Sequence, residues 1–363
     1  MIRIRPSVRF CIATMLVTQL LSSSLQAKSP RMVEFFLDGR SQSGLALANS
    51  RSEMIVIARD GAMHTLDPKR PELRLRPIDA KFSAASTAEV RNELRAEFGP
   101  EFEVRSTTNF LVVQPRGRGE RWPRLFEQCH RSFVQYMQRR GVKVREGRFP
   151  MIAVVFPDEN AMYAEFHRQK IDVSRVAGLY SSDSNRVMTH DGGRVSYIAA
   201  TVRHEAAHQS AFNSGVHSRV NETPRWISEG LGQMFEPPSM ASPLSSSQLA
   251  DRLNRESFDH LQKKFGDRSD SNFAEAVVRL IGDDAMFKNS NQVETAYAIS
   301  WALMFYLAER DSDAFAAILN HTAARPPFRA YPRQQRLKDF QTVVGSDPIE
   351  FSHQVQWFLQ SQK

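Results

Sequence analysis

The sequence predicts an α+β protein in which a β-rich region is followed by mixed strand and helix segments and then by a helical part. Short alternating apolar runs with Asp-Gly and Asn-Ser turns fill residues 31–77. Strands alternate with helices between residues 86 and 169, and helical periodicity dominates after Pro238. The 363 residues are enough for about two or three domains and for a substantial core.

The first 27 residues have the layout of a secretory signal. A basic start is followed by an apolar stretch from Phe10 to Leu21 and by small and polar residues up to Ala27. The apolar stretch is shorter than the roughly 20 residues that span a bilayer. We therefore expect cleavage after Ala27 and an exported bacterial protein, periplasmic or secreted, without stable membrane insertion. Leu25 occupies a position that favours small residues, which leaves an uncleaved anchor as an alternative.

The charge of the chain does not indicate a nucleic-acid partner. The formal net charge is +8, but Arg3, Arg5 and Arg9 lie in the expected signal, and without these three residues the excess is +5. An excess of this size favours solubility more than nucleic-acid binding. Residues 116–124 are rich in arginine, and we interpret them as a solvated loop before the next helix.

Residues 31–80 are predicted to form a small β module. Four short runs alternate between apolar and polar residues and end in turn-forming residues, as strands of a small β-barrel or β-sandwich do. The runs cover residues 32–39, 45–50, 54–61 and 62–68.

The rest of the chain is predicted to divide into a core domain, residues 100–238, and a helical subdomain, residues 239–363. Strands that alternate with helices imply a sheet with helices packed on it. In and just before the core domain we expect helices at 86–99, 121–141 and 159–169 and strands at 109–115 and 151–158. In the subdomain the clearest helices cover residues 247–266, 293–311 and 348–362.

A possible metal-binding motif lies at residues 204–208, which read HEAAH. Apolar and small residues recur at helical spacing around it, and residues four apart on a helix share one face. His204 and His208 would thus direct imidazole nitrogens toward one point, as two zinc ligands do. Glu205 is rotated away from that point, where its carboxylate could accept a proton from a water activated by zinc.

A third ligand is predicted in the sequence ETPRWISEGLGQMFEPP, because a catalytic zinc site normally has three protein ligands. Glu229 falls in the first turns of a predicted helix, among apolar and small neighbours. Gly230 and Gly232 are unfavourable inside a helix, and they indicate a close approach to the helix of the two histidines. Gln233 and Glu236 follow on a similar face of the predicted helix. Either side chain could orient a histidine ligand through its second ring nitrogen.

HEAAH followed after twenty residues by Glu229 in the sequence WISEG resembles the gluzincin metallopeptidases. More closely, it resembles the peptidase-MA-like domains of exported bacterial proteins. The resemblance covers residues 100–360 and implies a zincin-type domain, with a mixed sheet lobe and active-site helices in the peptidase core. It also implies Zn²⁺ held by His204, His208 and Glu229, with Glu205 as the catalytic base and a peptide or protein as the substrate.

The resemblance extends to two further segments. Residues 178–190 are similar to the edge strand that lines the substrate cleft in this family, and residues 296–307 are similar to a downstream helix that carries an oxyanion-stabilising tyrosine. The candidate for that tyrosine is Tyr297. The segment GLYSSDS lacks the glutamate of the aminopeptidase signature, which favours an endopeptidase over an aminopeptidase.

Other functions are compatible with the same residues. The chain could be a non-catalytic zinc-binding scaffold, with the β module as its binding element, or a zinc hydrolase of a non-peptide amide in the cell wall. Retention of Glu205 favours an enzyme. His190 and His217 could also approach the metal, although core or surface roles are the favoured interpretation for both.

Overall fold

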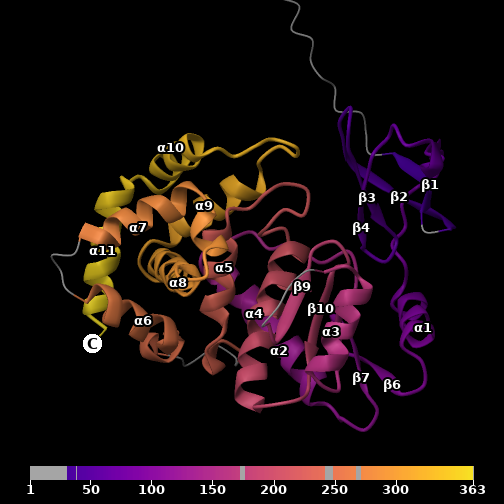
Figure 1. The fold of residues 1–363 in the computed structure, drawn as a ribbon, viewed down its shortest axis with the longest axis horizontal. Helices are drawn as coiled ribbons and strands as arrows, with labels where there is room; N and C mark the ends of the chain where they lie inside the picture. Colours follow the sequence, from indigo (N-terminus) through magenta and orange to yellow (C-terminus); the bar gives the residue numbers. More distant parts are fainter. Residues whose placement is uncertain (1–30, 38, 172–175, 242–247, 267–270, 363) are drawn as a thin grey trace, which may run out of the picture.

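The computed structural model describes residues 31–37, 39–171, 176–241, 248–266 and 271–362. The fold is a mixture of α and β structure, with a β region at the N-terminal side and helices at the C-terminal side (Figure 1). The expected signal, residues 1–27, lies outside the described residues. Among the helices that are described, none has the length and apolar character needed to cross a membrane.

The predicted β module is an open five-stranded antiparallel sheet, with the strand order β4-β3-β2-β1-β5. The expectation of a barrel was wrong, because β4 and β5 form the two edges and do not pair with each other in the described part of the chain. A core of Val33, Phe35, Val56 and Leu66 packs on the sheet. The strands are β1 (Met32–Leu37), β2 (Arg40–Asn49), β3 (Met54–Ala58), β4 (Met63–Leu66) and β5 (Arg76–Ile78).

A second five-stranded sheet has the order β6-β7-β8-β10-β9. Its three central strands are parallel, and the outer strands β6 and β9 run antiparallel to their neighbours. Within the described part of the chain, β9 is an edge strand of this sheet. The strands are β6 (Phe102–Ser106), β7 (Phe110–Pro115), β8 (Met151–Phe156), β9 (Gly178–Ser181) and β10 (Arg186–His190).

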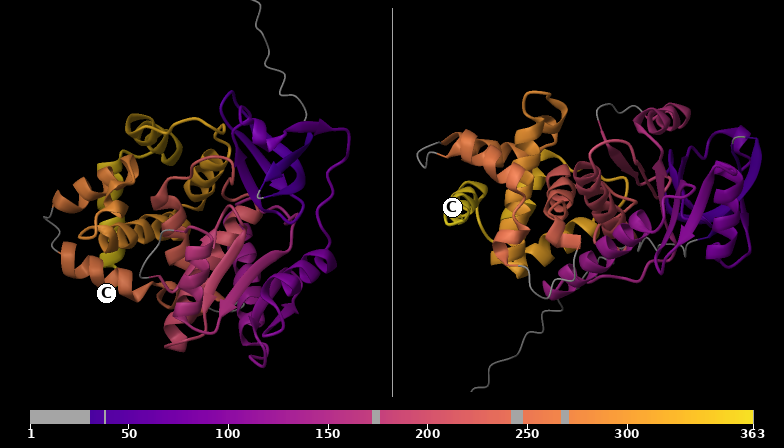
Figure 2. Two further views of the ribbon diagram at one scale, coloured as in Figure 1. Left: turned by 45° about the vertical axis from the view of Figure 1, so that its right-hand side comes forward. Right: turned by 90° about the horizontal axis from the view of Figure 1, so that it is seen from below.

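Helices cover both faces of the second sheet (Figures 1 and 2). Strand residues alternate between the faces: Phe110 and Val112 belong to a core shared with α2 and α4, whereas Leu111 and Val113 belong to a core shared with α1 and α3. The helices are α1 (Thr87–Phe98), α2 (Arg121–Arg139), α3 (Glu159–Arg168) and α4 (Val195–Asn213).

The C-terminal part is helical and is built around α8, whose side chains are mostly buried. The short helix α5 packs on α8 and also on α4, so it connects the helical part to the second sheet. The helices are α5 (Arg225–Phe235), α6 (Arg255–Phe265), α7 (Ser271–Gly282), α8 (Val293–Arg310), α9 (Ser312–Ala323), α10 (Arg333–Val344) and α11 (Pro348–Gln360).

The helix predicted over residues 247–266 is divided in the structure. A 3₁₀ turn covers Leu249–Arg252, and α6 begins only at Arg255. The division occurs at Asn254, whose side chain accepts a hydrogen bond from the backbone N–H of Ser257 and so caps α6. The apolar periodicity continues across this cap, which explains the wrong prediction.

A buried carboxylate fixes α2 to the loop between β6 and β7. Glu127, 8% exposed, accepts hydrogen bonds from the Thr107 hydroxyl, from the backbone and side-chain nitrogens of Asn109, and from Arg131. Burial alone would raise the pKa of Glu127, but these donors outweigh it and lower the pKa. A lowered pKa in the folded state means that the stabilisation is present at neutral pH and is lost as the pH falls through that pKa.

Glu127→Gln should lower the free energy of unfolding at pH 7 by about 1–3 kcal/mol, because an amide group then faces the donors of Asn109 and Arg131. Urea unfolding at pH 7 and at pH 3 measures the effect, and the difference between variant and wild type should shrink at the lower pH. An equal difference at both pH values would contradict this explanation.

Candidate metal centre

Two packed helices bring the predicted ligands together. His204 and His208 lie one turn apart on α4, and Glu229 lies on α5 opposite them. The two histidines are 8% and 9% exposed. In the described part of the chain, these three residues form the cluster of His, Cys, Asp and Glu side chains that could hold a metal ion.

The ligand atoms of these three residues form a nearly regular triangle. The Nε2 atoms of His204 and His208 are 2.9 Å apart, and Oε2 of Glu229 lies 3.4 Å from the first and 3.5 Å from the second. Tetrahedral ligands bound to zinc at about 2.0–2.1 Å are about 3.3 Å from one another. The donor set and its spacing therefore fit a zinc ion.

The electrostatics of the triangle match a site for a cation. Burial alone would raise the pKa of Glu229, but the facing histidines hold it well below its ordinary value. Burial alone would lower the pKa of His204, but the carboxylates of Glu229 and Glu236 hold it well above its ordinary value. A metal ion bound at this position would compete with protons for the same groups.

Glu205 points to the edge strand β9 rather than into the triangle. Its Oε2 accepts a hydrogen bond of 2.7 Å from the backbone N–H of Tyr180. This contact fixes the carboxylate beside the ligands but outside the set that could bind the metal. The geometry agrees with a group that receives a proton rather than one that coordinates a cation.

Glu236 orients His204 from the side opposite the metal triangle. Its Oε1 lies 2.9 Å from Nδ1 of His204, and its Oε2 accepts a hydrogen bond of 2.8 Å from Nδ2 of Asn254. A carboxylate on the second nitrogen fixes the ring and its tautomer and leaves Nε2 free to bind metal. Of the two orienting candidates, Glu236 occupies this position, whereas Gln233 bonds Asn254 and Ser257 instead.

Glu236→Ala should weaken zinc binding by about 10- to 100-fold, the usual cost of losing such an orienting partner. Glu236→Gln, which retains an acceptor oxygen, should fall between the alanine variant and the wild type. Competition with a zinc-binding dye measures the dissociation constants. Glu256→Ala is the matched control, because Glu256 is exposed on α6 and lines the neighbouring cavity without contacting a ligand. Equal affinity in Glu236→Ala and the control would exclude the orienting role.

The two glycines of α5 face different neighbours. A Cβ atom on Gly232 would lie 2.6 Å from both Cε1 and Nε2 of His204, so this glycine makes room for the ligand ring. A Cβ atom on Gly230 would lie 2.3 Å from the carbonyl oxygen of Ser300 and 2.7 Å from Cγ of Met304, which are both on α8. Close approach to α4, the helix of the two histidines, therefore explains Gly232, and the same explanation for Gly230 was wrong.

Tyr297 reaches the same region from α8. It is partly buried, and its ring packs edge-on against Phe287 at 5.4 Å. Burial and the nearby carboxylate of Glu229 raise the pKa of its hydroxyl, so the group stays protonated and can donate a hydrogen bond. Together with Glu236 it lines a cavity of about 310 Å³.

Arg225 is a neighbour of the site that the sequence did not indicate. Its guanidinium group lies 3.4 Å from Oε1 of Glu229, the oxygen that does not face the histidines, and stacks over the ring of Phe287. The i,i+4 spacing of Arg225 and Glu229 on the helix was the available signal.

The two additional histidines lie outside the cluster. His190 ends β10 and is 6% exposed, and His217 follows α4 and is 1% exposed. Burial, followed by the effect of neighbouring His208, lowers the pKa of His217 to about 3. His217 is therefore a neutral side chain near the metal centre, and it is not a ligand in the described geometry.

Comparisons with known proteins give limited information about this site. A family model described as a protein of unknown function (DUF1570) matches residues 198–329, which include the three clustered residues, Glu205, Glu236 and Tyr297 but less than half of the chain. Antichymotrypsin-2 and antitrypsin from Bombyx mori are each 22% identical over 230 residues, or 57% of this chain. The alignments cover 56% and 54% of those two relatives, so the chain spans about half of their length.

Proposed function

We propose that this protein is a zinc-dependent metallopeptidase of the gluzincin type, similar to the peptidase-MA-like domains of exported proteins. The observation that carries the proposal is the triangle of ligand atoms from His204, His208 and Glu229, with edges of 2.9–3.5 Å and the Glu205 carboxylate fixed beside it. The names of the two silkworm relatives do not describe a metal-dependent enzyme, so the proposal depends on this geometry and on the sequence motif.

The side chains of the site have complementary roles in this proposal. Zinc bound by the three ligands would supply Lewis acidity to the reaction. Glu205 accepts a proton from the attacking water and delivers it to the leaving nitrogen. Tyr297, whose hydroxyl stays protonated, donates a hydrogen bond to the oxyanion. Glu236 and Arg225 act as positioning residues, since each contacts one of the ligands.

An endopeptidase is the preferred form of this activity. The N–H of Tyr180 on the free edge of β9 points to Glu205, so this edge faces the site. An extended peptide can bind to such an edge by adding a strand. The segment 178–184 carries no glutamate to hold a free amino terminus, which favours cleavage within a chain. With the expected signal at residues 1–27, we propose that the reaction takes place outside the cytoplasm.

Metal analysis of the purified protein together with a peptide-library digest tests this function. We expect about one zinc ion per chain, the number that three ligands can hold, and cleavage within peptides that stops when a chelator is added. Zinc without cleavage would favour the non-catalytic scaffold, and zinc with cleavage of cell-wall amides alone would favour the other hydrolase. A protein that binds no zinc under any condition would show that the site is wrong.

A further inference from the structure

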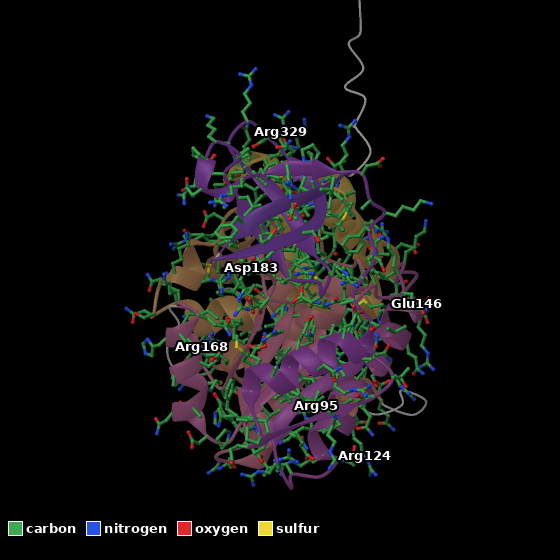
Figure 3. All side chains as sticks on the ribbon, turned by 90° about the vertical axis from the view of Figure 1, so that its right-hand side faces the viewer. Arg95, Arg124, Glu146, Arg168, Asp183 and Arg329 are labelled. Atoms are coloured by element: carbon green, nitrogen blue, oxygen red, sulfur yellow. The ribbon has the colours of Figure 1, made fainter. Side chains whose placement is uncertain are left out.

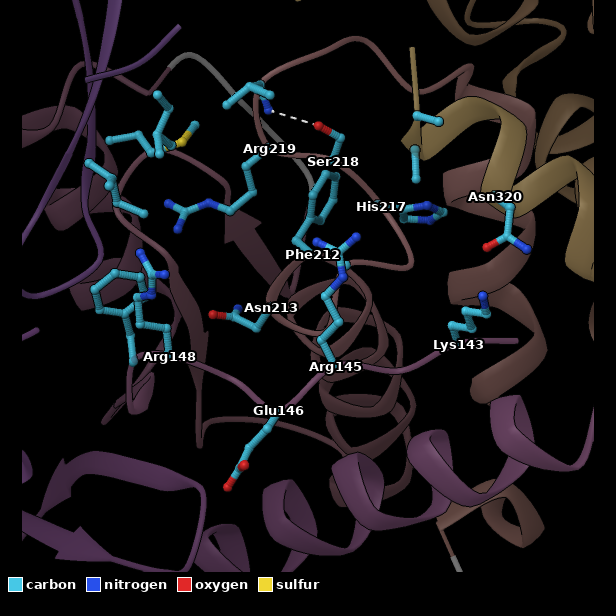
Figure 4. Close-up of a pocket in the computed structure, with 18 residues that line it drawn as sticks. Lys143, Arg145, Glu146, Arg148, Phe212, Asn213, His217, Ser218, Arg219 and Asn320 are labelled. Atoms are coloured by element: carbon cyan, nitrogen blue, oxygen red, sulfur yellow. Dashed lines mark hydrogen bonds between the residues drawn. The ribbon is translucent and has the colours of Figure 1, made fainter. Parts of the chain in front are cut away.

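A second cavity, separate from the metal ligands, lies where four segments of the chain meet. Its volume is about 600 Å³. Side chains of the N-terminal sheet, the loop at residues 143–149, the end of α4 with residues 215–220, and the end of α9 line it (Figure 4). A cavity of this size can hold a small organic molecule.

The lining of this cavity carries an excess of positive charge. Lys143, Arg145, Arg148 and Arg219 line it, against the single carboxylate of Glu146. In Figure 4 the guanidinium groups of the three arginines point into the space, whereas the Glu146 side chain points away from it.

Three of these cations have no carboxylate partner among the described residues. No acidic group of the described residues lies within 4.0 Å of the charged ends of Lys143, Arg145 or Arg148. The guanidinium carbon of Arg148 lies 5.5 Å from the centre of the Phe82 ring. Arg219 is different, because it donates hydrogen bonds to the carbonyl oxygen of Ser182. It also lies near the carboxylates of Asp60 and Asp183. An anion in the cavity would compensate the three unpaired charges.

His217 supplies an independent observation. It lines the cavity and is 1% exposed, yet neither ring nitrogen has a hydrogen-bond partner in the described part of the chain. The carbonyl group of Val216 lies beside the ring without forming such a bond. Among the described residues, His217 is the side chain with two buried polar atoms that lack partners. Such atoms are costly unless a ligand or water satisfies them, and a neutral imidazole offers one donor and one acceptor.

Part of the cavity lining is apolar. Leu47, Ile57 and Met63 of the N-terminal sheet contribute to it together with Phe149, and Leu47 is 37% exposed. A ligand that fills the space would therefore contact both cations and hydrocarbon.

We propose that this cavity binds an amphipathic organic anion, with a carboxylate or phosphate group held by Arg145 and Arg148, a polar contact to His217, and an apolar body against Leu47 and Met63. Both head groups carry negatively charged oxygens, which a guanidinium group can bind through two parallel hydrogen bonds. This site does not depend on the proposed peptidase activity, because no metal ligand lines it.

Calorimetric titrations of the full chain test the proposal, with octanoate, octyl phosphate and octanol as probes below their aggregation concentrations. The protein is first treated with EDTA, so that no probe can bind through a metal. We expect one or both of the anions to bind at least about tenfold more tightly than octanol. The anion that binds more tightly identifies the preferred head group. Equal binding of octanol, or no binding of either anion, would overturn the proposal.

The double variant Arg145→Gln/Arg148→Gln should weaken binding of the anion by about tenfold. Its matched control is Arg95→Gln/Arg124→Gln, since both of those arginines are exposed on helices away from Glu146 (Figure 3). An equal loss in the two double variants would indicate non-specific attraction and overturn the site. Binding should also change the NMR chemical shifts of the His217 imidazole nitrogens, which are assigned by comparison with His217→Gln. Binding that leaves these chemical shifts unchanged would mean that the ligand binds elsewhere and would overturn the proposal.

Discussion

Glu205→Gln should lower kcat/KM for peptide hydrolysis by about 10²- to 10⁴-fold, the usual contribution of a general base, and should leave the bound zinc in place. The amide cannot accept a proton, but it has the shape of the carboxylate and can still accept the hydrogen bond from the Tyr180 N–H through its oxygen. Because Glu205 is not one of the three clustered ligands, the affinity for zinc should remain close to that of the wild type.

This result separates the enzyme from a zinc-binding scaffold. Kinetics on a peptide that the wild type cleaves and zinc content measured on the same sample give the two readouts. Glu101→Gln is the matched control, because Glu101 is exposed in the loop before β6 and belongs to none of the elements that carry the site residues. Cleavage by Glu205→Gln within a few fold of the wild type would contradict the proposed role. Loss of zinc in this variant would mean that Glu205 helps to hold the metal.

The centre of the site could be predicted from sequence because it depends on local geometry. The two histidines are one helical turn apart, so their shared direction follows from the helix alone. Glu229 could be added because Gly230 and Gly232, which follow it closely, had no other role in a helix interior, and the structure places Gly232 against the His204 ring. Which of Gln233 and Glu236 orients His204 could not be decided, since both follow Glu229 at helical spacing.

The parts that sequence did not predict depend on long-range packing. Asn254 interrupts an apolar pattern that continues on both sides of it, and its amide contacts Glu236 from 18 positions away. Gly230 faces α8, a helix about seventy positions later, and no local pattern reports that contact. The cavity around His217 combines side chains from four separate segments. From sequence alone, the arginines of the loop at residues 143–149 therefore could not be distinguished from ordinary surface residues.

Gly232→Ala should weaken zinc binding by more than about 100-fold, a larger effect than loss of an orienting partner. The added Cβ would lie 2.6 Å from Nε2 of His204, the atom that faces the metal. The ring cannot easily turn aside, because Glu236 bonds its other nitrogen at 2.9 Å. A displaced ring leaves two ligands, which is one fewer than a catalytic zinc site normally has. Peptide hydrolysis should be lost with the metal.

Two substitutions on the same helix show whether the effect arises from the ligand ring. Ser228→Ala is the control, because its hydroxyl bonds only the carbonyl oxygen of Arg225 one turn earlier, and it should bind zinc as the wild type does. Gly230→Ala should instead lower the melting temperature of the metal-free protein, since its Cβ meets the backbone of α8 and overpacking costs about 1–3 kcal/mol. Zinc titration and thermal unfolding of the three metal-free variants separate the two effects. If Gly232→Ala binds zinc as tightly as Ser228→Ala, contact with this glycine does not set the position of His204.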